Sequence, residues 1–246
     1  MSNLISDKSA REHRNLEKMA IVIRFLKQEV YTNLETLMLL LGYKKRPPLD
    51  RLLNKLIALE YIQKHVYEFP TGKISIWGIT DLGLAQELEE TDRDFQAFEP
   101  YRVKFQTLNH RLLNQRVRIY LERQGWEGWH NGDRYSFREK YDVENRPDAV
   151  IKSPNGHLIA IETERTIKNL SRYRAIFKSH IIAKQKQYWS AVFYIVPDEK
   201  MKAVLNKRFD QIEYVQFDES RHKFEDYRKK IVRVFTVEEL QHLTAN

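Results

Sequence analysis

Residues 146–164 place the strongest constraint on what this chain can fold into. Two short runs of compact or β-branched residues, 149–151 and 159–161, lie on either side of the segment 153–157, Ser-Pro-Asn-Gly-His. Proline fixes one backbone torsion of a turn, and asparagine and glycine tolerate the positive φ that tight turns require. The pattern therefore predicts two short strands joined by a tight turn.

Acidic residues stand at the ends of this predicted hairpin. Asp148 leads the first strand, and Glu162 and Glu164 end the second. Because side chains alternate along a strand, the two glutamates share one face, and the hairpin brings Asp148 near them. Oxygen ligands favour Mg²⁺ or Mn²⁺ over Zn²⁺, so the pattern predicts a divalent-metal site. The alternative is a strand end that is neutralised by ion pairs with Arg165 or Lys168.

The order Pro147-Asp148, hairpin, Glu162-x-Glu164 resembles the PD-(D/E)xK nuclease superfamily, whose pattern usually ends in lysine. Glu164 stands at the lysine position, a departure that some restriction-type nucleases share. The resemblance implies a restriction-endonuclease-like α/β domain in which Asp148 and Glu162 hold Mg²⁺ or Mn²⁺ for catalysis. Glu164 would either add a third ligand or act as a base toward water. Arg165 or Lys168 would then supply the positive charge that the usual lysine provides.

The fuller strings Arg-Pro-Asp-Ala (146–149) and Ile-Glu-Thr-Glu-Arg-Thr (161–166) resemble the replication-relaxation family, and more narrowly the MOBC-type mobilisation relaxases. The resemblance spans nearly the whole chain and implies a winged-helix domain followed by a nuclease-like domain. It implies nicking of DNA at a plasmid origin of transfer or replication, with accessory mobilisation or coupling proteins as partners. In that family a histidine lies in the first helix of the nuclease-like domain, where this chain has His110. His110 is either near the active site or part of an interior pair with Asn114.

Composition sets the outer bounds. The 246 residues are 42% hydrophobic and 31% charged, enough for one large or two small folded domains. No apolar run approaches the roughly 20 residues that span a membrane, and the first residues lack a signal-peptide pattern. The chain has no cysteine, which excludes disulfides and thiolate metal sites. We expect a cytoplasmic protein without membrane insertion.

The excess positive charge lies in the second part of the chain. Residues 1–98 have 14 basic and 14 acidic side chains, and residues 99–246 have 28 and 20, a difference of +8. Between Arg165 and Pro197 there are seven basic residues and no acidic one. A long stretch of one sign attracts phosphates, so we expect Arg172, Arg174 and Lys178 to contact DNA. The alternative is a solvated helix face.

The N-terminal half, residues 1–98, shows a winged helix-turn-helix pattern. The sequence predicts helices over 14–30, over 34–41 between Asn33 and Gly42, and from Pro47-Pro48 onward. Two strands follow at 61–67 and 73–79, and Thr80 would cap a helix from residue 81 to about residue 90. In such domains the third helix usually enters the major groove.

Basic residues lie at the start of the third predicted helix and on the predicted wing. Those expected to contact DNA are Lys44, Lys45, Arg46, Arg51, Lys55 and, on the wing, Lys73; Lys64 would also flank the wing. Winged helices also mediate protein contacts, and this half is neutral overall, so DNA binding rests here on analogy with the fold.

The second predicted domain, residues 99–246, follows an acidic connection at 90–100. Its expected elements are a helix over 103–124 with Val103, Thr107, His110, Asn114, Val117 and Leu121 inward, a strand pair within 126–137, the hairpin, a basic helix, a strand at 191–196, a helix at 199–209, and strands at 212–217 and 231–235. Thr236 and Glu239 have capping-box spacing and would open a last short helix.

Other chemistries are disfavoured. The chain has no P-loop or glycine-rich dinucleotide motif, and none of its eight histidines lies within a turn of another, so a histidine-clustered metal site is not expected. Two classes of function remain open. One is a metal-dependent DNA-nicking enzyme; the other is a non-enzymatic winged-helix regulator with a degenerate nuclease-like domain, which the missing lysine favours.

Overall fold

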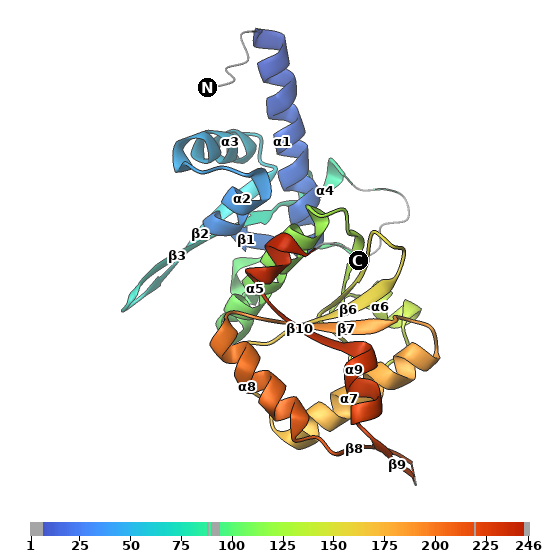
Figure 1. Cartoon of the computed structure of the whole chain (residues 1–246). Helices are drawn as coiled ribbons and strands as arrows, with labels where there is room; N and C mark the ends of the chain where they lie inside the picture. Colours follow the sequence, from blue (N-terminus) through green and yellow to red (C-terminus); the bar gives the residue numbers. More distant parts are fainter. Residues whose placement is uncertain (1–6, 88, 90–93, 219, 244–246) are drawn as a thin grey trace. The chain divides into compact units, whose positions relative to one another are not determined.

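A computed structural model describes residues 7–87, 89, 94–218 and 220–243. The chain has the expected mixed α/β composition and divides into two compact units, Met1–Gln115 and Arg116–Asn246 (Figure 1). Each unit has its own sheet and its own packed core, and each is described by itself. No helix in the described part of the chain is both long and apolar enough to cross a membrane.

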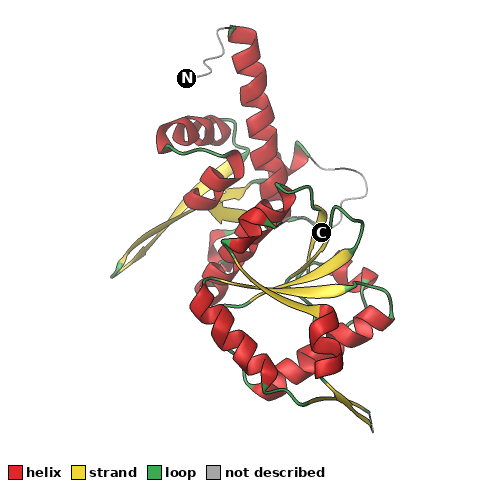
Figure 2. Cartoon of the chain, viewed as in Figure 1, coloured by secondary structure: helices red, strands yellow, loops and turns green. Residues whose placement is uncertain are grey.

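The first unit combines helices with a small antiparallel sheet. Its elements are α1 (Lys8–Glu29), β1 (Tyr31–Asn33), α2 (Leu34–Leu41), α3 (Arg46–Ala58), β2 (Ile62–Phe69), β3 (Gly72–Ile79), α4 (Asp81–Ala85), the 3₁₀ helix η1 (Pro100–Arg102) and the first part of α5 (Phe105–Glu122). The sheet has the order β1-β3-β2, and β2 and β3 form a long hairpin (Figure 2). The three expected helices before residue 60 and the two expected strands are confirmed, whereas β1 was not expected.

Local capping explains where these helices begin and end. The Asn33 side chain accepts a hydrogen bond from the Thr36 N–H at 3.0 Å, and left-handed Gly42 ends α2. The Thr80 hydroxyl likewise accepts from the Gly83 N–H at 3.0 Å and starts α4. These caps satisfy backbone groups that a helix end leaves unpaired. The helix from Thr80 ends at Ala85, earlier than expected, and residues 88 and 90–93 of the expected helix and connection lie outside the described residues.

The boundary between the units differs from the expected one after residue 98. Phe98 is 2% exposed and its N–H donates to the Ile79 carbonyl at 2.7 Å. Val103, Leu108 and Leu112 continue the same core, which also contains residues 30, 31 and 76. Because these apolar side chains are buried against the first sheet, the chain up to Gln115 belongs to the first unit.

Helix α5 confirms the helix expected over 103–124 but buries a different face at its start. Thr107 is exposed, and His110 and Asn114 are half-buried, whereas Leu108 and Leu112 are buried. The expected inward stripe was therefore wrong from Thr107 to Asn114, because Leu108, Leu112 and Leu113 offer more apolar surface to bury. Gln115 completes this part of the helix, with its Nε2 donating to the Tyr31 carbonyl at 2.8 Å.

The second unit is built on a five-stranded mixed sheet. Its elements are the rest of α5, β4 (Glu127–Asn131), α6 (Tyr135–Lys140), β5 (Ala149–Lys152), β6 (Leu158–Thr163), α7 (Leu170–Gln185), β7 (Ala191–Val196), α8 (Glu199–Asp210), β8 (Tyr214–Phe217), β9 (Ser220–Lys223), α9 (Glu225–Ile231), β10 (Val232–Thr236) and the 3₁₀ helix η2 (Glu239–His242). The sheet order is β10-β7-β6-β5-β4, with β6, β7 and β10 parallel. Strands β8 and β9 form a separate pair (Figure 2).

Side-chain alternation gives this sheet two buried faces. Val150, Ala160 and Val192 share one core cluster with α7 and α8 side chains such as Phe177 and Phe209. On the other face, strand residues of odd number, among them Ile159 and Ile161, pack with the end of α5 and with η2. The sheet therefore lies between two layers, as expected for a sheet buried on both sides.

Two sequence predictions for this unit were wrong. The segment 126–137 forms only the strand β4 and then begins α6, because the Gly132 N–H bonds to Asp148 at the start of β5 and Phe137 turns inward as the buried residue of α6. The helix α9 and the strand β9 were not expected, since β9 is fully exposed and α9 buries only Ile231. Strand β4 also has a bulge between Glu127 and His130.

Candidate functional site: a buried carboxylate cluster

The β5–β6 hairpin confirms the prediction from residues 146–164. Gly156 has φ of +82°, and the Ser153 N–H donates to the His157 carbonyl at 2.8 Å to close the turn. Ala149 pairs with Ile161, so Asp148 and Glu162 come next to each other at the open end of the hairpin. The sequence thus brings two of the predicted site residues together through strand register alone.

Gly132 helps to fix the strand end that presents Asp148. A Cβ atom at residue 132 would lie 1.9 Å from the Pro147 carbonyl oxygen, so only glycine permits this approach. The Gly132 N–H donates to the Asp148 carbonyl at 2.8 Å, and Arg146 Nη1 donates to the Gly132 carbonyl at 2.8 Å. The end of β4 therefore holds the backbone of residues 146–148 in place.

Thr163 on β6 helps to hold Asp148. Its Oδ2 accepts hydrogen bonds from the Thr163 N–H at 2.7 Å and from the Thr163 hydroxyl at 2.8 Å. These two bonds fix the orientation of the carboxylate.

Glu162 is buried against helix α7. Its Oε1 lies 3.1 Å from His180 Nε2, and the His180 side chain is 1% exposed. Burial raises the pKa of Glu162 above its usual range, the hydrogen bond from His180 opposes this, and the nearby Asp148 carboxylate raises the pKa further. Strand β7 places Tyr194 directly beside Glu162 in the parallel register.

Glu164 lies just beyond the end of β6 and has two side-chain partners. Lys168 Nζ lies 2.6 Å from Glu164 Oε1, and the Tyr173 hydroxyl donates to Oε2 at 3.2 Å. Burial raises the pKa of Glu164, Lys168 and the Tyr173 hydrogen bond lower it, and the charge of Asp148 raises it again. The charges of Asp148 and Lys168 act on both glutamates, so these groups form one electrostatic cluster.

Two polar atoms near the cluster have no hydrogen-bond partner among the described residues. They are the Tyr194 hydroxyl and His180 Nδ1, and both side chains are almost fully buried. Burial raises the pKa of Tyr194 well above its usual value, and the charges of Glu162 and Glu164 add to this rise. Unpaired buried polar atoms are costly, and they commonly mark positions that a ligand or an ordered water fills.

The structure brings only part of the predicted site together. Asp148, Glu162, Glu164 and Lys168 form the cluster, whereas Arg165 is exposed and has no ion pair among the described residues. Within the described part of the chain, no group of three acidic or histidine side chains is arranged to hold a metal ion. Glu164 is engaged by Lys168, and the metal-binding role predicted for the three carboxylates stays a prediction.

His110 belongs to the first unit, and the carboxylates belong to the second. The structure describes His110 as a half-buried residue of α5, and its expected place near the active site stays a prediction. Asn114 Oδ1 has no hydrogen-bond partner among the described residues, so the interior pair with His110 through that oxygen is not formed.

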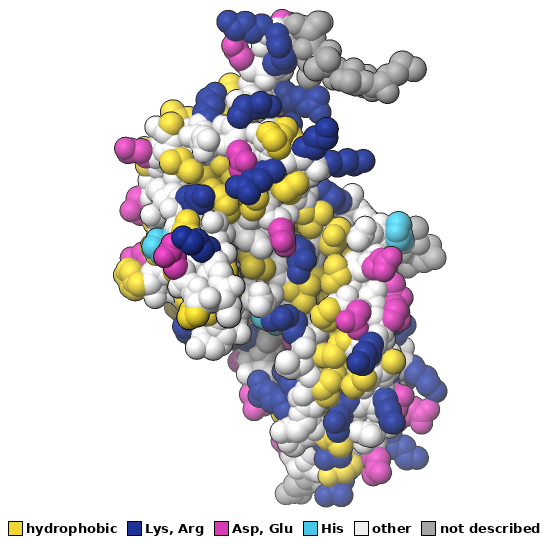
Figure 3. Space-filling model, turned by 90° about the vertical axis from the view of Figure 1, so that its left-hand side faces the viewer, with side chains coloured by type: hydrophobic (Ala, Val, Ile, Leu, Met, Phe, Trp, Pro, Cys, Tyr) yellow, Lys and Arg dark blue, Asp and Glu magenta, His cyan; other side chains and the backbone are white. Residues whose placement is uncertain are grey.

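The basic residues of the first unit that were expected to contact DNA are exposed. Those expected to contact DNA at α3 are all on the surface: Lys44, Lys45, Arg46, Arg51 and Lys55. Arg46 pairs with Asp50 at 3.0 Å, and Lys73 pairs with Glu68 across the β2–β3 hairpin. Figure 3 shows Lys and Arg side chains between hydrophobic ones on the drawn face of the chain. Exposed ion pairs of this kind are weak and leave the cations accessible to phosphates.

The basic stretch of α7 does not form one uniform face. Arg172 is exposed, whereas Arg174 is half-buried with its guanidinium 4.6 Å from the centre of the Tyr214 ring. Lys178 is half-buried, 3.9 Å from Asp218, and Lys186 is paired with Asp142 at 2.8 Å. The solvated cations of this stretch are therefore Arg165, Arg172 and Lys184.

Sequence reasoning missed the supporting residues of the cluster, namely Thr163, Tyr173, His180 and Tyr194. A signal for His180 was present, because it continues the apolar stripe Tyr173, Ile176, Phe177 of α7, which is buried. The other residues on this buried face are mostly apolar. A glutamate at the end of the preceding strand is therefore one of the few polar groups that such a histidine can reach.

Comparisons of the chain with protein-family models, with curated proteins and with solved structures found no match.

Proposed function

We propose that this chain is a divalent-metal-dependent DNA endonuclease of the relaxase type. The observation that carries the proposal is the cluster of buried carboxylates at the open end of β5–β6, in which burial and mutual charge raise the pKa of Glu162 and of Glu164. Carboxylates with perturbed pKa values are concentrated at functional sites. The same hairpin carries the Pro-Asp and Glu-x-Glu residues that resemble the PD-(D/E)xK pattern.

Asp148 and Glu162 are the residues that would hold Mg²⁺ or Mn²⁺. They are hard oxygen ligands, they repel each other, and a cation between them would relieve this repulsion. Two unpaired polar atoms, on His180 and Tyr194, lie in the same region and fit a site that takes a further group. When bound, the metal would supply Lewis acidity toward a phosphodiester.

The other residues of the cluster would orient these ligands and balance charge. Thr163 fixes Asp148 through two hydrogen bonds, and His180 fixes Glu162 through one. Such supporting bonds set the direction of a carboxylate ligand. Lys168 reaches Glu164 from the loop before α7 and places a positive charge in the cluster, as the lysine of the usual pattern would. This supports Lys168, rather than Arg165, as the residue that supplies the positive charge of the usual lysine.

DNA recognition is proposed for the first unit as a winged helix-turn-helix. The order of α2, α3 and the β2–β3 hairpin fits that plan, and the start of α3 carries exposed Lys44, Lys45 and Arg51. A helix of this kind reads base edges in the major groove, while other cations contact phosphates. We further propose that the substrate is a plasmid origin of transfer or replication and that accessory mobilisation or coupling proteins take part, as the relaxase resemblance implies.

A second candidate function is DNA binding without catalysis. It is favoured by the internal neutralisation of the glutamates, because Glu162 already contacts His180 and Glu164 already contacts Lys168. In that case the cluster would have only a structural role, and the first unit would recognise an operator sequence in DNA.

The test is incubation of supercoiled plasmid DNA, with and without an origin, with the full chain and Mg²⁺ or Mn²⁺. We expect nicking that Asp148→Ala or Glu162→Ala abolishes, while DNA binding stays within a few-fold, because a lost metal ligand affects the chemical step. Asp142→Ala is the matched control, since Asp142 is an exposed acid paired with Lys186 outside the cluster. Full nicking activity in either cluster variant would contradict the proposed metal site. Specific binding by the full chain without any nicking would favour the regulator.

A further inference from the structure

A pocket of about 440 Å³ lies on the second unit, on the opposite face of the sheet from the carboxylates. Ile159, Ala191 and Phe193 line it and point to the face that carries the odd-numbered strand residues. Ser153 and His157 from the β5–β6 turn line its rim, at the end of the hairpin away from Asp148. The pocket is thus separate from the carboxylate cluster.

Aromatic rings form much of the pocket wall. Trp126 and Phe193 have ring centres 5.9 Å apart, and those of Phe193 and Phe235 are 4.9 Å apart. Phe193 and Phe235 are half-buried, so ring surface remains accessible. Trp126 is 5% exposed, and its indole Nε1 has no hydrogen-bond partner among the described residues. Flat aromatic walls suit a planar ring such as a nucleobase.

The rim of the pocket is positively charged. Lys230 and Arg233 line it, both are exposed, and neither forms an ion pair with an acidic side chain of the described residues. None of the lining residues is acidic. A guanidinium and an ammonium on the lining of one pocket suit a phosphate group.

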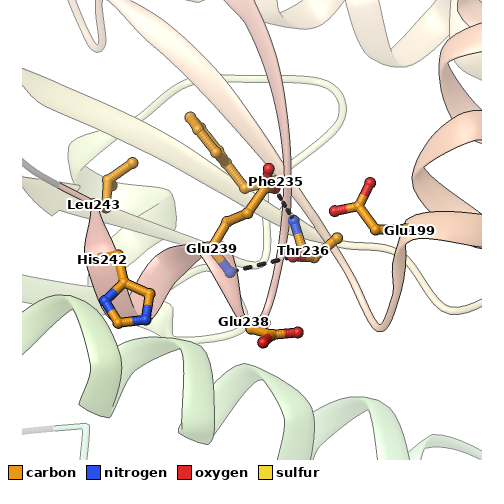
Figure 4. Close-up of a pocket in the computed structure, with 7 residues that line it drawn as sticks. All are labelled: Glu199, Phe235, Thr236, Glu238, Glu239, His242 and Leu243. Carbon is orange, nitrogen blue, oxygen red and sulfur yellow. Dashed lines mark hydrogen bonds between the residues drawn. The ribbon is translucent and has the colours of Figure 1, made fainter.

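A neighbouring pocket shows the opposite charge. It shares Phe235 and Leu243 with the first pocket but is lined by Glu199, Glu238 and Glu239 (Figure 4). Glu239 is engaged there, since its Oε2 accepts from the Thr236 N–H at 2.7 Å and its N–H donates to the Thr236 hydroxyl at 3.2 Å. Lys202 pairs with Glu239 at 2.5 Å and lies 3.9 Å from Glu199, so it neutralises part of this acidic lining. The lining that carries Lys230 and Arg233 and no acidic residue is therefore the better place for a phosphate.

We propose that the pocket lined by Trp126, Phe193, Phe235, Lys230 and Arg233 binds a nucleotide, with the base against the rings and the phosphate at the two cations. The volume is within the range of small-molecule sites, about 300–1,000 Å³. A free nucleotide and a nucleotide unit of a single strand share this chemistry. The inference does not depend on the proposed nuclease activity.

The test is calorimetric titration of the full chain in EDTA, which keeps divalent metals out of the measurement. The probes are dAMP, deoxyadenosine, inorganic phosphate and a 5′-phosphorylated tetradeoxyadenylate. We expect dAMP to bind about tenfold more tightly than deoxyadenosine or phosphate, because base and phosphate contacts act together. A tetranucleotide that binds more tightly than dAMP assigns the site to a strand, and equal affinity assigns it to a free nucleotide.

Matched variants locate the binding. Lys230→Gln/Arg233→Gln is expected to weaken dAMP about tenfold and leave deoxyadenosine unchanged, since it removes only the charge. Lys229→Gln is the control, because Lys229 is exposed, pairs with Glu225 and does not line the pocket. Ala191→Leu narrows the pocket and should weaken both ligands; if this variant melts early, Phe193→Leu replaces it. The proposal is overturned if phosphate binds as tightly as dAMP, if dAMP does not bind, or if these folded variants bind dAMP like the parent chain.

Discussion

Replacement of Lys168 by methionine tests the electrostatics of the carboxylate cluster. Lys168 Nζ lies 2.6 Å from Glu164 Oε1, and the two side chains are 34% and 3% exposed. An exposed ion pair contributes about 0.2–1 kcal/mol, whereas removal of one partner from a fully buried pair costs about 3–5 kcal/mol. Because Lys168 is one-third exposed, water screens part of its charge. We therefore expect Lys168→Met to lower the free energy of unfolding by about 2 kcal/mol near neutral pH.

The cost should depend on pH with a defined sign. Burial raises the pKa of Glu164 above the ordinary 4.5, and Lys168 opposes this rise, so loss of Lys168 raises the pKa further. A carboxyl with a raised folded pKa stabilises the fold below its unfolded pKa, and this stabilisation is lost as pH rises through the folded pKa. The deficit of Lys168→Met is therefore largest at neutral pH and shrinks as pH falls toward 4.5, where Glu164 is protonated in the variant.

Urea unfolding followed by tryptophan fluorescence measures this cost. Trp126, Trp129 and Trp189 lie in the second unit, so most of the signal reports the unit that carries the cluster. Lys184→Met is the matched control, since Lys184 is an exposed lysine of the same basic stretch. The double variant Glu164→Gln/Lys168→Met should recover stability, because a neutral amide needs no counter-charge. An equal loss at every pH, or a double variant no more stable than Lys168→Met, would refute the reasoning.

Two further predictions concern the basic stretch and Glu162. Joint replacement of Arg165, Arg172 and Lys184 by glutamine should flatten the dependence of DNA affinity on salt, because these cations are solvated; Arg174→Gln, half-buried against an aromatic ring, should change this slope less. Equal log–log slopes for the triple variant and the parent would show that the stretch is only a solvated face. Glu162→Gln should raise the free energy of unfolding at neutral pH, since burial raises the pKa of this carboxyl, and the gain should vanish toward pH 4.5. Thermal or urea denaturation across pH checks this, and a gain that persists at low pH would contradict it.

Local signals explain the parts of the fold that the sequence predicted well. Asn33, Gly42 and Thr80 act within three or four residues of their own position, so their effect on helix ends needs no knowledge of the rest of the chain. The turn at Gly156 is local in the same sense. The segment 126–137 was misread because its outcome depends on a contact between Gly132 and the backbone of residues 147–148, which no local pattern shows.

For the carboxylate site, too, the sequence predicted the features that follow from local strand pairing. Strand alternation and register placed Asp148 and Glu162 together, because both follow from a hairpin with a fixed turn. The partners of these acids could not be deduced in that way. His180 reaches Glu162 only after α7 packs on the sheet, and Tyr194 comes beside Glu162 only through parallel pairing of β6 with β7. Tertiary packing thus decides how the charges of the cluster are balanced.

The bulge in β4 has a consequence for how the molecule avoids self-association. Strand β4 is an outer strand of the five-stranded sheet, and its pairing with β5 shifts between Glu127 and His130. A regular outer strand offers a row of free backbone groups to which the strand of another copy can add. The extra residue bends this row, and the pair Glu127–Lys152 adds charge at the same place. The irregular strand therefore protects the sheet edge from aggregation while the rest of the sheet stays regular enough to hold its carboxylates in register.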